Sequence, residues 1–175
     1  EEKLKEKSLT PEQLAEICER TSDTLTTKYR GLDGNVAKEL GVRWEYNTDG
    51  SLKAMYFPAY VKDNGEMKVT GYKVRDLPKN FYSLAYVGKC NLMGGMTSQV
   101  AETLIVVAGE IEILTAIQAM KSADKYRKSY NIITSLTGES STADDLKNHY
   151  EWVNKHQKII ICMDNDSAGE KAFDE

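Results

Sequence analysis

The sequence predicts an α/β protein in two parts: a small basic α+β subdomain with an antiparallel sheet, then a parallel-sheet domain with helices on both faces. Residues 52–75 alternate between apolar and polar side chains, which is typical of strands with one solvated face. After residue 100 the strands lose this alternation and are separated by helical stretches, as in a parallel sheet covered on both sides. The basic character comes from residues 53–89, where seven Lys and Arg residues outnumber three Asp and Glu residues.

The overall composition is that of an ordinary soluble globular protein, with 41% hydrophobic residues, 29% charged residues and a net charge of −4. No apolar run is long enough to span a membrane and the N-terminus does not resemble a signal peptide, so we expect a cytoplasmic protein without membrane contact. The chain lacks an initiator Met and ends in the helix-like stretch "AGEKAFDE". We therefore expect it to be a fragment of a longer protein.

Cysteine and histidine give little sign of a disulfide or zinc site. Cys18, Cys90 and Cys162 are far apart and form no CxxC pair, which indicates a reducing compartment. His149 and His156 lie seven residues apart on a predicted helix without a neighbouring cysteine. We expect both to be solvated or half-buried rather than zinc ligands.

Residues 1–28 are predicted to form an N-terminal tail and a helix. Thr10 can cap the helix, Pro11 occupies its first position, and Gln13 can complete a capping box.

Residues 29–99 are predicted to form the basic subdomain. A short helix in "DGNVAKELGVRW" ends at Gly41, and three strands follow, of which the first two are joined by a turn at Asn64-Gly65. The predicted strands are "LKAMYFPAYV", "EMKVTGYKVR" and "NFYSLAYV". The glycine-bearing stretch "KCNLMGGMTSQ" is a predicted linker.

Residues 100–175 are predicted to form the parallel-sheet domain. The strands "TLIVVA", "NIITSL" and "KIIICM" alternate with the helices "EIEILTAIQAMK" and "TADDLKNHYEWVNKH", and another helix begins in "DSAGEKAFDE". Gly169 in that last stretch would allow close packing or the close approach of a phosphate. In an open parallel sheet, sites form beyond the carboxyl ends of the strands.

Four acids lie at these carboxyl ends. Glu110 and Glu112 follow the first strand, and Asp164 and Asp166 follow the third. The loops hold no Lys or Arg to neutralise them, so a cation between the acids would offset their repulsion. Such oxygen ligands suit Mg²⁺ or Mn²⁺ and predict a site for phosphoryl or nucleotidyl transfer. The alternative is that the acids only begin helices, where they stabilise the helix dipole.

The stretch "GYKVRDLPKNF" carries the most informative cations. Lys73 and Arg75 alternate along a strand, so we expect both side chains on one face, and Lys79 follows after a short turn. With Lys89 they form the predicted set that binds nucleic acid and nucleotide, among the aromatic residues Tyr72, Phe81 and Tyr82. The alternative is a solvated strand with core aromatics.

Taken in order, these stretches resemble the primase core of phage-type primase–helicases, a group that includes mitochondrial Twinkle-type proteins. More broadly they resemble the Toprim domain of bacterial replicative primases and topoisomerases. "YRGLDGNVAKELGV" resembles the helix that opens the polymerase core, and "GYKVRDLPKNF" resembles the basic segment that binds template and nucleotide. "VGKCNLMGG" resembles the connector, "LIVVAGEIEIL" the Toprim glutamate motif, and "IIICMDNDSAGEKA" the Toprim DxD motif.

The resemblance implies a single-stranded DNA template, ribonucleoside triphosphates and Mg²⁺ or Mn²⁺, with Asp164 and Asp166 as metal ligands. It also implies a zinc-binding module before this core and a helicase domain after it in the parent protein. A phage protein would act in the cytoplasm of its bacterial host, and a Twinkle-like protein in the mitochondrial matrix.

One position departs from the resemblance. The family has a catalytic, metal-binding Glu before the motif glycine, where this sequence has Ala108. An engineered Glu→Ala change, a natural loss of catalysis, and a site that relies on Glu110 are the three explanations. A milder departure is Glu139 in "SLTGESS", a loop that the family keeps small and glycine-rich.

The leading interpretation is the catalytic core of a DNA primase, a nucleotidyltransferase in which Glu110, Asp164 and Asp166 act in catalysis. A second is a phosphatase of the haloacid dehalogenase type, because "DNDSA" nearly matches its DxDx(T/V) motif. That motif usually follows the first strand of its domain, whereas here it follows the third. A third is a catalytically silent nucleic-acid-binding or assembly module of a replication protein, which Ala108 favours.

Overall fold

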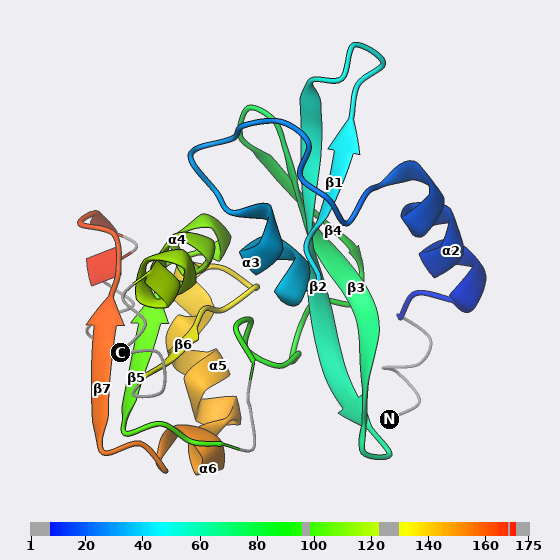
Figure 1. Ribbon diagram of the computed structural model, residues 1–175. Coiled ribbons are helices and arrows are strands. Elements are labelled where there is room, and N and C mark those ends of the chain that lie inside the picture. The colour runs from blue at the N-terminus through cyan, green and yellow to red at the C-terminus, as the bar shows by residue number, and fades with distance from the viewer. Residues whose placement is uncertain (1–7, 96–98, 123–129, 168, 171–175) are drawn as a thin grey trace. The chain divides into compact units, whose positions relative to one another are not determined.

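The computed structural model describes residues 8–95, 99–122, 130–167 and 169–170. The chain divides into two compact units, Glu1–Cys90 and Asn91–Glu175. The first holds a four-stranded antiparallel sheet and the second a three-stranded parallel sheet, which confirms the predicted fold class (Figure 1). The domain boundaries expected after residues 28 and 99 stay predictions.

The N-terminal sheet has the strand order β1-β2-β3-β4. Between β2 and β3, Asn64 and Gly65 have φ angles of 50° and 89°, the left-handed conformation that the Asn-Gly pair predicts for a two-residue hairpin. β4 lies at one edge of the sheet, and most of its residues are exposed. The strands are β1 (Arg43–Tyr46), β2 (Leu52–Asp63), β3 (Glu66–Asp76) and β4 (Asn80–Ala85).

Helix α2 (Pro11–Arg20) begins with the predicted capping box. The Gln13 N–H donates to Thr10 Oγ1 at 3.3 Å, and the Thr10 N–H donates to Gln13 Oε1 at 2.9 Å. Only Ile17 of α2 is buried, and it packs on one face of the sheet. The buried cluster consists of Ile17, Ala54, Tyr56, Tyr72 and Val74.

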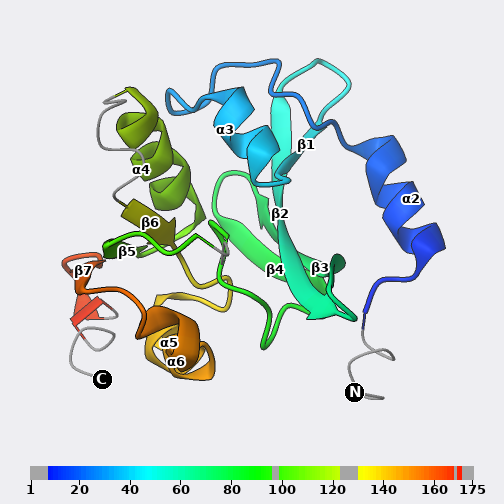
Figure 2. The same ribbon diagram turned by 60° about the horizontal axis from the view of Figure 1, so that its bottom comes forward.

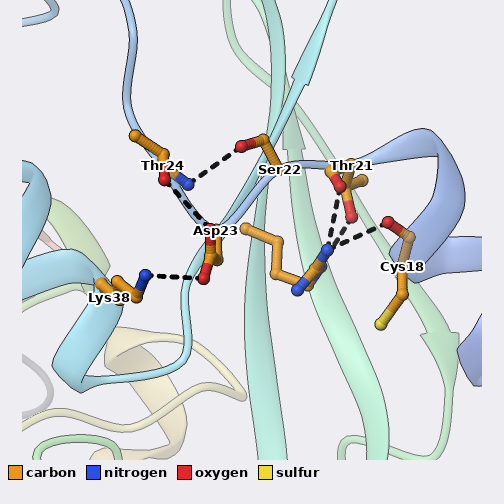
Figure 3. Close-up of polar contacts among 7 residues, drawn as sticks. Cys18, Thr21, Ser22, Asp23, Thr24 and Lys38 are labelled. Carbon is orange, nitrogen blue, oxygen red and sulfur yellow. Dashed lines mark hydrogen bonds and ion pairs between the residues drawn. The ribbon is translucent and has the colours of Figure 1, made fainter.

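Arg43 in β1 fixes the end of α2 to the sheet. Its Nε donates to Thr21 Oγ1 at 2.7 Å, and its Nη2 donates to the carbonyl oxygens of Thr21 and Cys18 at 2.8 and 3.0 Å (Figure 3). In the same region Lys38 pairs with Asp23 at 2.9 Å, an exposed ion pair that contributes little stability.

Helix α3 (Gly34–Glu39) agrees with the predicted short helix. Its N-cap is Asp33, which accepts a hydrogen bond from the Asn35 N–H at 2.8 Å. Gly41 follows the helix with φ of 74°, as expected for a glycine that ends a helix.

The C-terminal sheet has the order β6-β5-β7, and both strand pairs are parallel. All five residues of the central strand β5 are buried. Figure 2 shows α4 on one side of these strands and α5 and α6 on the other, as the unalternating strands predict. The elements are β5 (Thr103–Val107), α4 (Glu110–Ser122), β6 (Tyr130–Ile133), a 3₁₀ turn (Glu139–Ser141), α5 (Thr142–Asn148), α6 (Tyr150–Val153) and β7 (Lys158–Cys162).

The single helix predicted over residues 142–156 is wrong, because the chain breaks it at His149. His149 has φ of −113° and ψ of 22°, and its carbonyl oxygen accepts the N–H groups of both Trp152 and Val153. This turn lets Trp152 and Val153 join the core formed by the sheet. Local sequence did not reveal the break because no Gly or Pro marks it.

Two further details differ from expectation. β1 was not predicted, because its four residues are too few for a clear alternation. His156 is more buried than expected, with 8% of its surface exposed. Its Nε2 lies 2.8 Å from Asn131 Oδ1 and its Nδ1 lies 3.0 Å from the Val153 carbonyl oxygen, so its role is structural. No described helix is long and apolar enough to cross a membrane.

Candidate functional site

The parallel register of the C-terminal unit brings the two acidic motifs to one edge of the sheet. β5 pairs directly with β7, and their last residues, Val107 and Cys162, are partners in the register. The chain therefore leaves both strands at the same level. The stretch 108–112 follows β5 and the stretch 163–166 follows β7, which is the arrangement that the sequence predicts.

The acids at this edge have different environments. Glu110 begins α4 and is 5% exposed, whereas Glu112 is exposed. The Glu112 carboxylate turns back toward the start of the helix, because a Cβ added at Gly109 would lie 2.9 Å from Glu112 Oε2. Asp164 and Asp166 are both exposed. Asp164 also lines a pocket of about 490 Å³, together with residues 161–163, Asn165, Gly169 and Glu170.

Backbone contacts fix the loop that carries Asp164 and Asp166. The Gly169 N–H donates to Asp166 Oδ1 at 3.0 Å, and the Glu170 N–H donates to the Asp166 carbonyl oxygen at 2.9 Å. Gly169 packs so closely that a Cβ there would overlap the Asp164 carbonyl oxygen. The close packing predicted for Gly169 is therefore confirmed, and Asp166 starts the turn that follows.

Glu139 makes a contact that the sequence did not predict. It comes from the loop after β6, and its Oε1 accepts the Asp164 N–H at 2.8 Å. The same oxygen lies 3.0 Å from where a Cβ of Gly169 would be. The glutamate that departs from the small, glycine-rich loop pattern thus holds the Asp164 loop. The only signal in the sequence was that departure from the loop pattern after β6.

The loop after β6 is held internally as well. Asp145 accepts hydrogen bonds from the hydroxyl groups of Ser135 and Thr137, the second at 2.6 Å. Ser135 is 1% exposed. Because one carboxylate holds both hydroxyl groups, the loop that carries Glu139 is anchored to α5.

The donor chemistry at this edge fits a hard divalent cation. In proteins Mg²⁺ is held by one or two carboxylates, with water and substrate phosphates as its other ligands. Asp164 and Asp166 offer two exposed carboxylates of that kind. Within the described ranges no three His, Cys, Asp or Glu residues form a group that could hold a metal ion. A direct metal contact by Glu110 or Glu112 therefore stays a prediction.

Ala108 lies between the end of strand β5 and the acids at the edge of the sheet. It directly follows the buried strand β5 and is half-buried, and Gly109 separates it from α4. A methyl group at this position can neither ligate a metal nor accept a proton.

Two of the four predicted cations, Lys73 and Arg75, lie on β3. Lys73 Nζ lies 5.5 Å and Arg75 Cζ 5.3 Å from the centroid of the Phe81 ring, which confirms that both side chains share a face. Arg75 and Phe81 are direct partners across the β3–β4 pair. Arg75 is 9% exposed, and its Nε has no hydrogen-bond partner among the described residues. We call Lys73, Arg75 and Phe81 the cation–aromatic face.

The three aromatic residues of this region have different roles. Tyr72 is 4% exposed and belongs to the core under α2, so the core alternative was right for it. Phe81 and Tyr82 are each 41% exposed and point to opposite faces of β4, because they are consecutive in a strand. Of these three aromatic residues, only Phe81 lies beside both Lys73 and Arg75.

Of the other five basic residues in the 53–89 segment, Lys62 is exposed, and the remaining four fall into two groups. Lys53 pairs with Glu45 at 2.7 Å and Lys68 pairs with Asp63 at 2.8 Å, so acids in the same sheet already balance their charges. Lys79 is exposed in the turn between β3 and β4, and Lys89 is exposed after β4.

Comparisons with known proteins agree with this architecture. The Toprim-like family model matches residues 105–175. The DNA helicase/primase of Enterobacteria phage T3 is 26% identical over 147 residues, which is 83% of this chain but only 24% of the phage protein. This chain thus spans about a quarter of that relative's length.

Two solved structures from bacteriophage T7 have a similar fold. The primase fragment of the T7 primase-helicase is 26% identical with a TM-score of 0.67, over 87% of this chain and 58% of that one. A complex of the T7 lagging-strand DNA polymerase with two primase domains, bound to an RNA/DNA hybrid and dTTP, matches with 25% identity and a TM-score of 0.65. That match covers 86% of this chain and 70% of the other. The chain is therefore a homologue of the phage T3 and T7 DNA helicase/primases, with a Toprim-like segment over residues 105–175.

Proposed function

We propose that this chain is the core of a DNA primase that joins ribonucleotides on a single-stranded DNA template. The observation that carries the proposal is the direct pairing of β5 with β7, which gathers the acidic motifs at one edge of a Toprim-like sheet. Homology to the phage helicase/primases supports it. The parent protein would carry a helicase domain and a zinc-binding module and would act in the cytoplasm of a bacterial host.

In this proposal the acids and cations have separate roles. Asp164 and Asp166 hold Mg²⁺ or Mn²⁺, with Glu110 and Glu112 beside them at the sheet edge. When bound, the cation would stabilise the charge on the transferring phosphoryl group. Template and nucleotide are bound by Lys73, Arg75, Lys79 and Lys89, whose positive charges attract the phosphates.

Restoring a carboxylate at the end of β5 tests the catalytic role. We expect Ala108→Glu, placed in the longer parent protein, to raise the synthesis of oligoribonucleotides on single-stranded DNA by at least about 100-fold, since removing a single charge-stabilising catalytic group typically costs that much. The measurement is incorporation of labelled ribonucleotide with Mg²⁺ or Mn²⁺. Ala108→Gln is the matched control, because it has a similar size but no negative charge.

The outcomes separate the candidate functions. No product from Ala108→Glu, with single-stranded DNA binding retained, would contradict a silenced primase. That result would favour the second candidate, a silent nucleic-acid-binding module, which Ala108 itself supports. Release of phosphate from a simple phosphomonoester would favour the phosphatase instead.

A further inference from the structure

Phe81 is placed unlike a core aromatic residue. It lies on the edge strand β4 with 41% of its surface exposed, although a buried phenylalanine would contribute more stability. Lys73 and Arg75 both lie against its ring. An exposed ring beside two cations can bind a ligand that has a flat π-system and a negative charge.

Arg75 gives independent support for such a ligand. Arg75 as a whole is 9% exposed, and its Nε is buried with no hydrogen-bond partner within the described residues. Removing a cation from water is costly unless hydrogen bonds or an opposite charge compensate. A phosphate oxygen at Arg75 would provide both.

We propose that Phe81 is the platform on which one unpaired base of a single-stranded DNA stacks, while Arg75 and Lys73 bind the adjoining phosphate. The inference rests on the proposed function only for the identity of its ligand. Base–aromatic stacking tolerates any sequence, because every base has a π-face.

Tyr82 provides a matched control within the chain. It is the next residue in β4 and is 41% exposed like Phe81, yet it points to the opposite face. A general loss of aromatic surface would therefore affect Phe81→Leu and Tyr82→Leu equally, whereas stacking at the cation–aromatic face would affect only the first.

The test measures binding of a labelled oligodeoxythymidylate to the full 175-residue chain by fluorescence anisotropy over a series of salt concentrations. We expect Phe81→Leu to weaken binding about tenfold without a change in salt dependence, because stacking involves no counterion release. Tyr82→Leu is expected to bind like wild type. Unchanged binding in Phe81→Leu, or an equal loss in both variants, overturns the proposal.

A second variant reports the contact directly. The chain has two Trp residues, Trp44 and Trp152, which are 0% and 8% exposed. Phe81→Trp adds an exposed indole, whose fluorescence we expect the oligonucleotide to quench. Absence of quenching while the DNA binds overturns the proposal even if Phe81→Leu fails to fold.

The same measurements separate this inference from the proposed function. If the wild type binds DNA but Phe81 has no effect, only the stacking contact fails. If the wild type does not bind single-stranded DNA, both fail. If Phe81→Leu weakens binding of ATP but not of the oligonucleotide, the platform serves a free nucleotide, and the strand contact is overturned.

Discussion

Glu45 in β1 shows how one residue couples the stability of the N-terminal unit to pH. Its carboxylate accepts hydrogen bonds from Lys53 and from the Tyr56 hydroxyl group. Burial raises the pKa of Glu45, but the bonds from Lys53 and Tyr56 outweigh it and hold the pKa below its ordinary 4.5. Burial and the same carboxylate raise the pKa of Tyr56 above its usual range.

The first prediction at this scale concerns acid. A carboxylate whose pKa is depressed in the folded state stabilises the fold above the unfolded pKa and loses that contribution as pH falls through the folded pKa. We expect the free energy of unfolding of the N-terminal unit to fall as pH drops below 4.5. The free energy of unfolding of Glu45→Gln should fall less over the same pH range.

The fluorescence of Trp44 makes this pH dependence of the unfolding free energy measurable. Trp44 is fully buried in β1, so its fluorescence during urea unfolding reports on the N-terminal unit, best in a Trp152→Phe background. Glu16→Gln is the control, an exposed acid on α2. An equal pH dependence in wild type and Glu45→Gln would contradict the role of Glu45.

At the scale of elements, the loop after β7 depends on one glycine. Gly169→Ala adds a Cβ that overlaps the Asp164 carbonyl oxygen, so the loop or the following turn must shift. We expect the C-terminal unit to lose about 1–3 kcal/mol of unfolding free energy, the usual cost of overpacking. Trp152 fluorescence during urea unfolding measures it.

Gly88→Ala, followed by Trp44 fluorescence because Gly88 lies in the N-terminal unit, is the control for a Gly→Ala change that the structure accommodates. Gly88 has no contact closer than 3.9 Å to an added Cβ, and its φ is not among the positive ones. We expect a change below about 1 kcal/mol, the ordinary range for an accommodated Gly→Ala change. If Gly169→Ala is as stable as Gly88→Ala, the loop is looser than its contacts indicate.

For the whole molecule, the acidic edge and the cation–aromatic face belong to different units. We therefore expect their functions to be separable. Asp164→Asn with Asp166→Asn should abolish Mg²⁺ binding in calorimetry while single-stranded DNA binding stays the same or increases, because negative charge is lost.

Lys73→Ala with Arg75→Ala is the reciprocal variant. It should weaken DNA binding and make the slope of log K against log salt concentration less steep by about 0.7 for each phosphate contact that is lost. Mg²⁺ binding should stay intact. Loss of DNA binding in the aspartate variant, or unchanged DNA binding in the lysine–arginine variant, would contradict this division of roles.

Much of the fold followed from local patterns. The Asn64-Gly65 turn, the capping box at Thr10 and the unalternating β5 each reflect chemistry within a few residues. The acidic edge also followed, because parallel strands end on one side of their sheet. The contact of Glu139 with Asp164 did not follow, since its partners lie 25 residues apart.

The sequence by itself determined the two-part α/β class, the helix and hairpin signals, and the acidic and basic motifs, because backbone propensity and side-chain periodicity act over short distances. Only the tertiary structure decided that Phe81 rather than Tyr72 joins Lys73 and Arg75, and that the chain breaks at His149. Those outcomes depend on strand register and on which side chains fill the core, and both are set by contacts between residues distant in the chain.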